Sequence, residues 1–174
     1  MITKETEAAR FNEGKVRFSL IDFSMFSDMP MNFSIITNIE TKEECIAKIM
    51  NLVSSIIFID DQKYIAKILP EVQALTYRLS LFTLDIEFYG GWAFDLRAFE
   101  SMARVLEYGC LKYDKNNWRK GYIDKFSSAD SLYRHLRQVI IGEELDAESG
   151  LPHIGHIMCN IMFLTNDLLY VKRN

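Results

Sequence analysis

The chain has few residues that interrupt helices. Its 174 residues include only three prolines and eight glycines, and no repeat or low-complexity tract divides it into separate domains. The three cysteines, Cys45, Cys110 and Cys159, are odd in number, far apart and set among apolar residues. This excludes a disulfide framework and is typical of reduced thiols in a cytosolic protein. The sequence therefore predicts a single helical domain.

Long apolar runs and an excess of positive charge are also absent. No apolar run approaches the roughly 20 residues of a membrane span, and the first residues lack the pattern of a signal peptide. Twenty basic and 24 acidic residues give a net charge of −4, whereas binding to the backbone of duplex nucleic acid needs a local excess of lysine and arginine. We expect a soluble cytoplasmic protein with neither a membrane nor duplex nucleic acid as partner.

The apolar residues recur at helical spacing and predict an all-α, single-domain bundle of about five helices. An extended N-terminal segment, at about 17–22, precedes the bundle. Thr41 and Glu44 form a capping box for the first helix, Pro70 predicts a kink or break in the second, and Gly109 predicts the end of the third. The first two helices should pair antiparallel, and the last should be central and buried. The predicted helices cover 42–57, 61–82, 95–108, 128–142 and 152–171.

All three histidines of the chain lie close together near its end. His135 falls on the apolar face of the fourth predicted helix. His153, His156 and Asn160 step by three and four residues along the fifth helix and form one polar stripe in an apolar surrounding. Buried polar groups need hydrogen-bond partners, so this stripe predicts contacts with another element, a metal or a ligand.

The loop before the fifth helix carries four carboxylates, which are Glu143, Glu144, Asp146 and Glu148. Carboxylates at this density repel one another unless a cation neutralises them, and Mg²⁺ or Mn²⁺ is the simplest such cation. Imidazole ligands would move the preference towards Mn²⁺, Co²⁺ or another transition ion. The alternative is an ordinary acidic surface loop, favoured by the dipole of the helix that follows.

A second polar loop, 112–121, contains four cations and two aromatic residues. Lysine and arginine suit a polyphosphate, and Trp118 or Tyr113 would stack on a base. The alternative is a charged loop whose aromatic residues cover the core. Glu100, Arg104 and Glu107 share one face of the preceding helix, either as part of a site or as a solvated face.

Several stretches, taken in order, resemble the phage and bacterial dATP/dGTP diphosphohydrolases, through the N-terminal domain that carries this name. The resemblance implies a helical protein similar to MazG-type pyrophosphatases. It also implies metal-dependent hydrolysis of purine deoxynucleoside triphosphates to monophosphate and pyrophosphate, an activity phages use to control nucleotide pools. The matching stretches are Phe11–Ile21, Ala103–Gly109, Lys112–Tyr113, Asn116–Gly121, Arg134–His135, Gly142–Asp146, Glu148–His153, His156 and Cys159–Asn160.

The resemblance also implies roles for individual residues. The implied catalytic residues are Glu144, His135 and Glu107. The implied ligands of Mg²⁺ or Mn²⁺, with Co²⁺ as a further option, are Glu143, Glu144, Asp146, Glu148, His153 and His156. The implied contacts to a purine nucleotide are Lys15, Arg17, Lys112, Asn117, Trp118, Arg119, Lys120, Arg134 and Asn160.

The chain departs from the family between about 23 and 95, where a helix-rich insertion replaces a connection that we expect to be short. This insertion would cover the pocket, build a dimer, or accompany the change of a hydrolase into a protein that only binds. Homo-oligomerisation is expected by analogy with MazG-type enzymes. Two alternatives remain open: a phage-encoded protein that sequesters nucleotides without turnover, for example to counter a host defence, and a helical protein whose insertion binds another protein.

Overall fold

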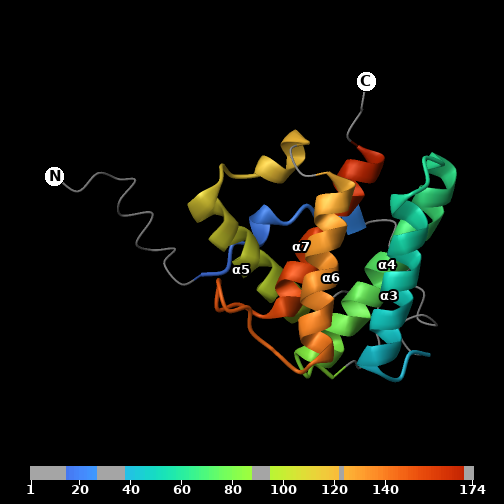
Figure 1. Cartoon of the computed structure of the whole chain (residues 1–174). Coiled ribbons are helices and arrows are strands. Elements are labelled where there is room, and N and C mark those ends of the chain that lie inside the picture. The colour runs from blue at the N-terminus through green and yellow to red at the C-terminus, as the bar shows by residue number, and fades with distance from the viewer. Residues whose placement is uncertain (1–14, 27–37, 88–94, 122–123, 171–174) are drawn as a thin grey trace.

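The computed structural model describes residues 15–26, 38–87, 95–121 and 124–170. Within these residues the fold has five α-helices, three short 3-10 helices and no β-strand (Figure 1). The predicted all-α bundle of five helices is confirmed. No helix in these ranges combines the length and the apolar character needed to cross a membrane.

Helices α3 (Lys42–Ile57) and α4 (Gln62–Thr83) form a hairpin, as predicted. The two helices pack side by side along one flank of the molecule (Figure 1). Half of the predicted capping box is present: the Thr41 hydroxyl accepts a hydrogen bond from the Glu44 amide at 3.1 Å, whereas the Glu44 carboxylate accepts from the Glu40 amide at 3.3 Å. Pro70 lies inside α4 and does not end it, so the predicted break is absent.

Helix α5 (Leu96–Lys112) is longer than predicted. Gly109 was expected to stop the helix, but it does not adopt the left-handed conformation that ends helices. The helix continues to Lys112, and the Tyr113 amide donates a last hydrogen bond to the Gly109 carbonyl at 2.8 Å. A 3-10 turn, η3 (Asn117–Lys120), follows in the cationic loop.

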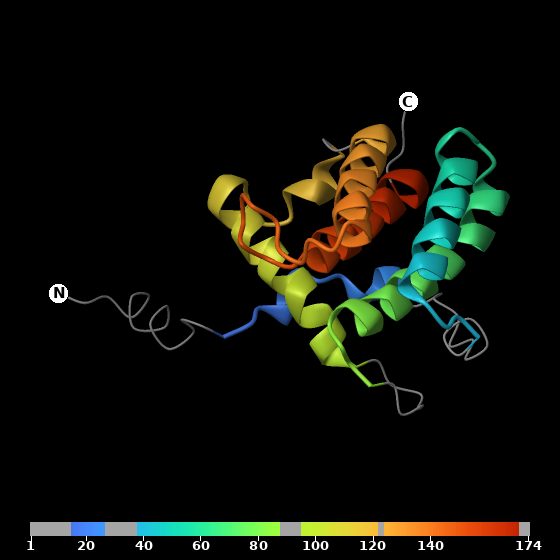
Figure 2. The same cartoon turned by 60° about the horizontal axis from the view of Figure 1, so that its bottom comes forward.

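Helix α6 (Lys125–Ile140) begins three residues before the predicted start, because the Asp124 carboxylate caps it by accepting from the Phe126 and Ser127 amides. The helix packs extensively against α7, described next, and more lightly against α3. Figure 2 shows α5, α6 and α7 grouped together, with the α3–α4 hairpin on the other side.

Helix α7 (His153–Leu169) is the central helix of the bundle, as predicted. It packs against α4, α5 and α6, and 14 of its 17 residues are buried. Gly155 lets α5 approach closely: a Cβ atom at this position would lie 2.5 Å from the Ser101 carbonyl oxygen. The first turn of α7 is therefore fixed in the interior, next to α5 and α6.

The N-terminal part of the described chain, 15–26, is less extended than predicted. It contains two 3-10 turns, η1 (Phe18–Leu20) and η2 (Phe23–Phe26), which pack on α5 and α7. The rings of Phe23 and Phe26 both contact Phe99 of α5. The earlier part of the predicted N-terminal motif, residues 11–14, lies outside the described residues.

Candidate functional site

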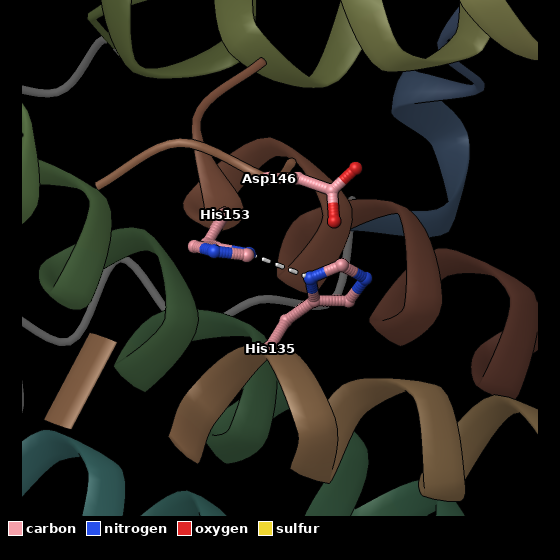
Figure 3. A group of neighbouring side chains, drawn as sticks. All are labelled: His135, Asp146 and His153. Carbon is pink, nitrogen blue, oxygen red and sulfur yellow. Dashed lines mark hydrogen bonds between the residues drawn. The ribbon is translucent and has the colours of Figure 1, made fainter. Parts of the chain in front are cut away.

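Three side chains from three different segments converge at the start of α7 (Figure 3). They are His135 on α6, Asp146 on the loop between α6 and α7, and His153 at the first position of α7. Each offers one nitrogen or oxygen atom, and these atoms all lie within 4.8 Å of one another. We call these three residues the His–Asp cluster. A carboxylate and two imidazoles at this spacing are able to hold a metal ion.

The two histidines of the cluster contact each other directly. Nδ1 of His135 and Nδ1 of His153 are 2.8 Å apart, so one of them donates a hydrogen bond to the other. The third histidine, His156, stacks on His135 with ring centroids 4.4 Å apart and an angle of 12° between the rings. His156 thus supports the ring of His135 and adds no atom to the group of converging ligand atoms.

Asp146 is held in place by Ser149. Oδ2 of Asp146 accepts hydrogen bonds from both the amide and the hydroxyl of Ser149, each at 2.9 Å. The same hydroxyl lies 2.9 Å from Nε2 of His156. Ser149 therefore connects the carboxylate to the helix, and Oδ1 of Asp146 accepts no hydrogen bond within the described part of the chain.

The backbone of the loop is also closed onto α7. The Asp146 amide donates to the Leu151 carbonyl at 2.8 Å, and the His153 amide donates to the Glu144 carbonyl at 2.9 Å. Gly150 lies between them with a φ of 68°, a conformation that side chains rarely adopt. These bonds fix Asp146 relative to His153.

Burial changes the charge states within the site. Burial, together with the neighbouring His156 and His153, lowers the pKa of His135 to about 4, although Asp146 opposes them. Burial also lowers the pKa of His156. For Asp146, burial raises the pKa, but the Ser149 hydrogen bonds and His156 outweigh it and the net shift is downward. At neutral pH the site therefore contains the Asp146 carboxylate beside the neutral imidazoles of His135 and His156, the protonation states in which such groups bind metals.

One atom of the cluster has no hydrogen-bond partner among the described residues. His153 is only 3% exposed, and its Nε2 is buried without a hydrogen bond in the described chain. A neutral imidazole carries one proton, so either tautomer leaves this nitrogen as an unsatisfied donor or acceptor. An unsatisfied buried polar atom costs about 1–3 kcal/mol. This nitrogen therefore needs a partner of its own, such as a water or a ligand, because Nδ1 is the nitrogen of the same ring that faces His135.

The four glutamates predicted for the site do not join the group of converging ligand atoms among the described residues. Glu143 accepts a hydrogen bond from Gln138 at 2.7 Å, and Glu148 forms an ion pair with Lys112. The carboxylate of Glu144 is exposed and has no hydrogen bond or ion pair in the described chain. Of the predicted carboxylate ligands, the structure places Asp146 alone in the His–Asp cluster.

The fourth glutamate, Glu107 on α5, lies elsewhere and accepts a hydrogen bond from the Arg17 amide at 2.8 Å. It therefore anchors the N-terminal segment to α5. Asn160, the last residue of the polar stripe, is buried and donates to Ser131 at 3.1 Å and to the His156 carbonyl at 2.8 Å. The prediction that the stripe needs partners from another element is confirmed, because Ser131 belongs to α6.

The predicted phosphate-binding cations lie on the surface. Lys112 sits over the Tyr108 ring and pairs with Glu148, and this hydrogen bond raises the pKa of Lys112. Arg119 pairs with Asp22 at 2.6 Å. Of the other side chains predicted to contact substrate, that of Asn117 is half-buried. Those of Lys15, Arg17, Lys120 and Arg134 are exposed.

Trp118 does not present its ring for stacking on a base. The side chain is 6% exposed and packs against Phe163 of α7 with ring centroids 5.8 Å apart. Its carbonyl accepts a hydrogen bond from Asn166 at 3.2 Å. The alternative interpretation, in which the aromatic residues of this loop cover the core, therefore describes Trp118, whereas Tyr113 is exposed.

Ser149 is the residue of the site that the sequence analysis missed. A signal for it was available, because an aspartate followed three residues later by serine is typical of a turn in which the carboxylate binds the following amide and hydroxyl. The donors of the His–Asp cluster, two nitrogens and one oxygen, suit a transition ion better than Mg²⁺, which prefers oxygen ligands.

Comparisons with known proteins place this site within a family. A family model described as "dATP/dGTP diphosphohydrolase, N-terminal" matches residues 86–171. A dATP/dGTP diphosphohydrolase from Salmonella phage PMBT28 is 34% identical over 70 residues, which cover 40% of this chain and 23% of the phage protein. No solved structure gives a significant match, so the likeness to MazG-type folds stays a prediction.

The matched residues contain α5, α6, α7 and the whole His–Asp cluster, whereas α3, α4 and the N-terminal motif lie outside them. The chain spans about a quarter of the length of the phage relative. Residues 86–171 of this chain therefore match the family of the N-terminal domain of dATP/dGTP diphosphohydrolases.

Proposed function

We propose that the protein hydrolyses purine deoxynucleoside triphosphates, dATP or dGTP, to the monophosphate and pyrophosphate with the help of a divalent ion. The observation that carries this proposal is the buried His–Asp cluster, which lies inside the family segment and brings two imidazoles and a carboxylate within reach of one ion. The printed name and phage origin of the relative supply the substrate class and suggest a role in nucleotide-pool control.

The proposed mechanism uses one group of residues to bind the metal ion and another to bind the phosphates. A bound Mg²⁺, Mn²⁺ or Co²⁺ would supply a polarised water and neutralise charge on the phosphates. His135, Asp146 and His153 would hold the ion, and Ser149 keeps the carboxylate of Asp146 in place. Lys112 would leave Glu148 to bind a phosphate oxygen, since an ion pair this exposed is weak.

Glu144 is the proposed acceptor of the proton from the attacking water. Its carboxylate has no bonded partner among the described residues, unlike the carboxylates of Glu107, Glu143 and Glu148. Its backbone carbonyl is bonded to the first amide of α7, which keeps Glu144 beside the cluster. A free carboxylate at this position is able to take a proton and release it to solvent.

A second function is nucleotide binding without turnover. It is favoured by the bonds that Glu107, Glu143 and Glu148 form with other residues. If these bonds persist with substrate present, fewer carboxylates are available for a metal and for base catalysis than the sequence predicts. A protein of this kind would retain nucleotide in proportion to its own concentration.

Product analysis separates the two functions. The purified chain is incubated with each deoxy- and ribonucleoside triphosphate in Mg²⁺, Mn²⁺, Co²⁺ or chelator, and the products are resolved by ion-exchange chromatography. Many turnovers per chain that yield monophosphate and pyrophosphate, lost in chelator and in Glu144→Gln, support the hydrolase. Retention of about one unchanged nucleotide per chain supports the binding protein.

Homo-oligomerisation is part of the same proposal. Phe58 and Phe126 are 75% and 46% exposed, yet their rings lie 5.8 Å apart and form an apolar patch between α3 and α6. Exposed apolar patches commonly mark contact surfaces. Light scattering after size-exclusion chromatography of the wild type and of Phe58→Ser would show whether a second copy covers this patch.

A further inference from the structure

The structure allows the metal centre to be defined more narrowly than the proposed function requires. We propose that His135, Asp146 and His153 are the complete set of protein ligands, and that they select a transition ion with affinity for imidazole, such as Zn²⁺ or Co²⁺, over Mg²⁺. The inference rests on the proposed function for the use of the ion, but its test measures binding and does not require turnover.

The geometry of the two imidazoles supports a shared ion. Two imidazole nitrogens bound to one metal at about 2.0–2.1 Å lie about 3 to 3.4 Å from each other. Nδ1 of His135 and Nδ1 of His153 are already 2.8 Å apart. An increase of less than about one ångström in this distance would allow two bonds to the ion to replace the hydrogen bond.

The carboxylate is placed to be the third ligand. Both hydrogen bonds from Ser149 go to Oδ2 of Asp146, so Oδ1 stays available within the described residues. Hydrogen bonds to a ligating carboxylate orient it and tune the metal. Ser149 and, through it, His156 therefore act on the ion by positioning Asp146, and neither is a ligand.

Selectivity follows from the donor set. Two nitrogen donors and a single carboxylate favour zinc, cobalt or iron, whereas Mg²⁺ prefers an all-oxygen shell and keeps several waters. The oxygen-rich site predicted from the sequence needs Glu143 and Glu148, and both are bonded to other side chains. Three protein ligands leave open positions on the ion for water or a phosphate oxygen.

Metal binding to the full chain tests this inference. The protein is stripped with chelator and titrated with Co²⁺, whose visible absorption reports the ligand set, and binding is measured by equilibrium dialysis with Mg²⁺ as competitor. We expect about one Co²⁺ per chain and retention in about thousandfold excess Mg²⁺. Asp146→Asn and His153→Gln should each weaken Co²⁺ binding by at least about 100-fold.

Matched controls lie on the same loop and helix. Glu143→Gln and Glu148→Gln make the same carboxylate-to-amide change as Asp146→Asn, and they should keep Co²⁺ binding within about threefold. His156→Gln should lose less affinity than His153→Gln. Circular dichroism confirms that each variant is folded, and Asp146→Asn, on a loop, keeps the test valid if a helix variant unfolds.

Three results would overturn the inference: displacement of Co²⁺ by equimolar Mg²⁺, an unchanged affinity in Asp146→Asn, or an equal loss in the glutamate variants. The proposed function can fail separately. Selective Co²⁺ binding without turnover would keep this centre and reject the hydrolase. Turnover with Mg²⁺ that is retained in Asp146→Asn would support the hydrolase and reject this centre.

Discussion

Two buried hydroxyls of α4 and the histidines at the start of α7 form their hydrogen bonds in different ways. In α4, Thr76 donates to the Val72 carbonyl at 2.7 Å and Ser80 donates to the Tyr77 carbonyl at 2.6 Å, so each bond stays within one helical turn. Around α7, the bonds of His153 and His156 run to residues of α6 and the loop.

The two kinds of hydrogen bond have different consequences. The first allows a polar side chain to be buried in a helical core, and the second holds the side chains of a site in place. A hydroxyl bonded to its own helix constrains nothing beyond that helix. A bond between segments fixes their relative position, and here the bonded groups are titratable. The family match covers the second region and not the first.

The largest change in stability is expected for a substitution in the α3–α4 hairpin. Leu75 in α4 is 1% exposed, so Leu75→Ala removes buried methyl groups and should lower the free energy of unfolding by about 2–5 kcal/mol. Urea denaturation measures this loss. Co²⁺ affinity of the folded variant should be unchanged, and a fall in its affinity would show that the two regions are coupled.

A somewhat smaller effect is expected where α7 meets α5. Gly155→Ala would place a Cβ atom 2.5 Å from the Ser101 carbonyl oxygen, and the overpacking should destabilise the protein by about 1–3 kcal/mol. Gly109→Ala is the control, because nothing lies within 4 Å of the new atom. In a helix interior this change should stabilise by about 0.5–1 kcal/mol. Equal midpoints of thermal unfolding for the two variants would contradict the close approach.

In the His–Asp site, Ser149→Ala should change metal affinity more than stability. The change removes the hydroxyl that joins Asp146 to His156, at a cost to folding of only about 0.5–1.5 kcal/mol. Co²⁺ affinity should nevertheless fall by about 10–100-fold, because the ligating carboxylate loses its orientation. An affinity equal to that of the wild type in equilibrium dialysis would remove Ser149 from the site.

The smallest effect is expected at Ser128, which matches Ser149 in chemistry but not in partners. Its hydroxyl oxygen is buried in α6 without a hydrogen bond in the described chain. Ser128→Ala removes an unsatisfied polar atom, so stability should stay the same or rise by up to about 1 kcal/mol, with Co²⁺ affinity unchanged. A marked loss of stability in urea denaturation would reveal a partner for this hydroxyl.

The sequence predicts the helices well because their signals are local. The capping box at Thr41 and the apolar period that follows it predict both ends of α3 correctly. The spacing of His153, His156 and Asn160 also predicts a buried stripe at the start of α7, since residues three and four apart share one face of a helix.

The partners of the surface charges could not be predicted in this way. Glu107 and Glu148 each bond to a residue far away in the sequence, Arg17 and Lys112 respectively. Such pairs depend on how whole helices are placed, which no spacing along one helix reveals. The sequence could not decide between the two interpretations of Trp118 for the same reason, because its burial depends on Phe163 of another helix.

Backbone hydrogen bonds close the loop that carries Asp146, so the number of residues in this loop determines where the carboxylate points. Backbone bonds join Asp146 to Leu151 and Glu144 to His153, so an inserted or deleted residue inside the loop would turn the carboxylate away from the histidines. Length changes in the turn between α3 and α4 meet no such constraint from the cluster. We therefore expect relatives that keep the cluster to keep the spacing of seven positions from Asp146 to His153. Relatives with another spacing should keep the helices and lack the centre.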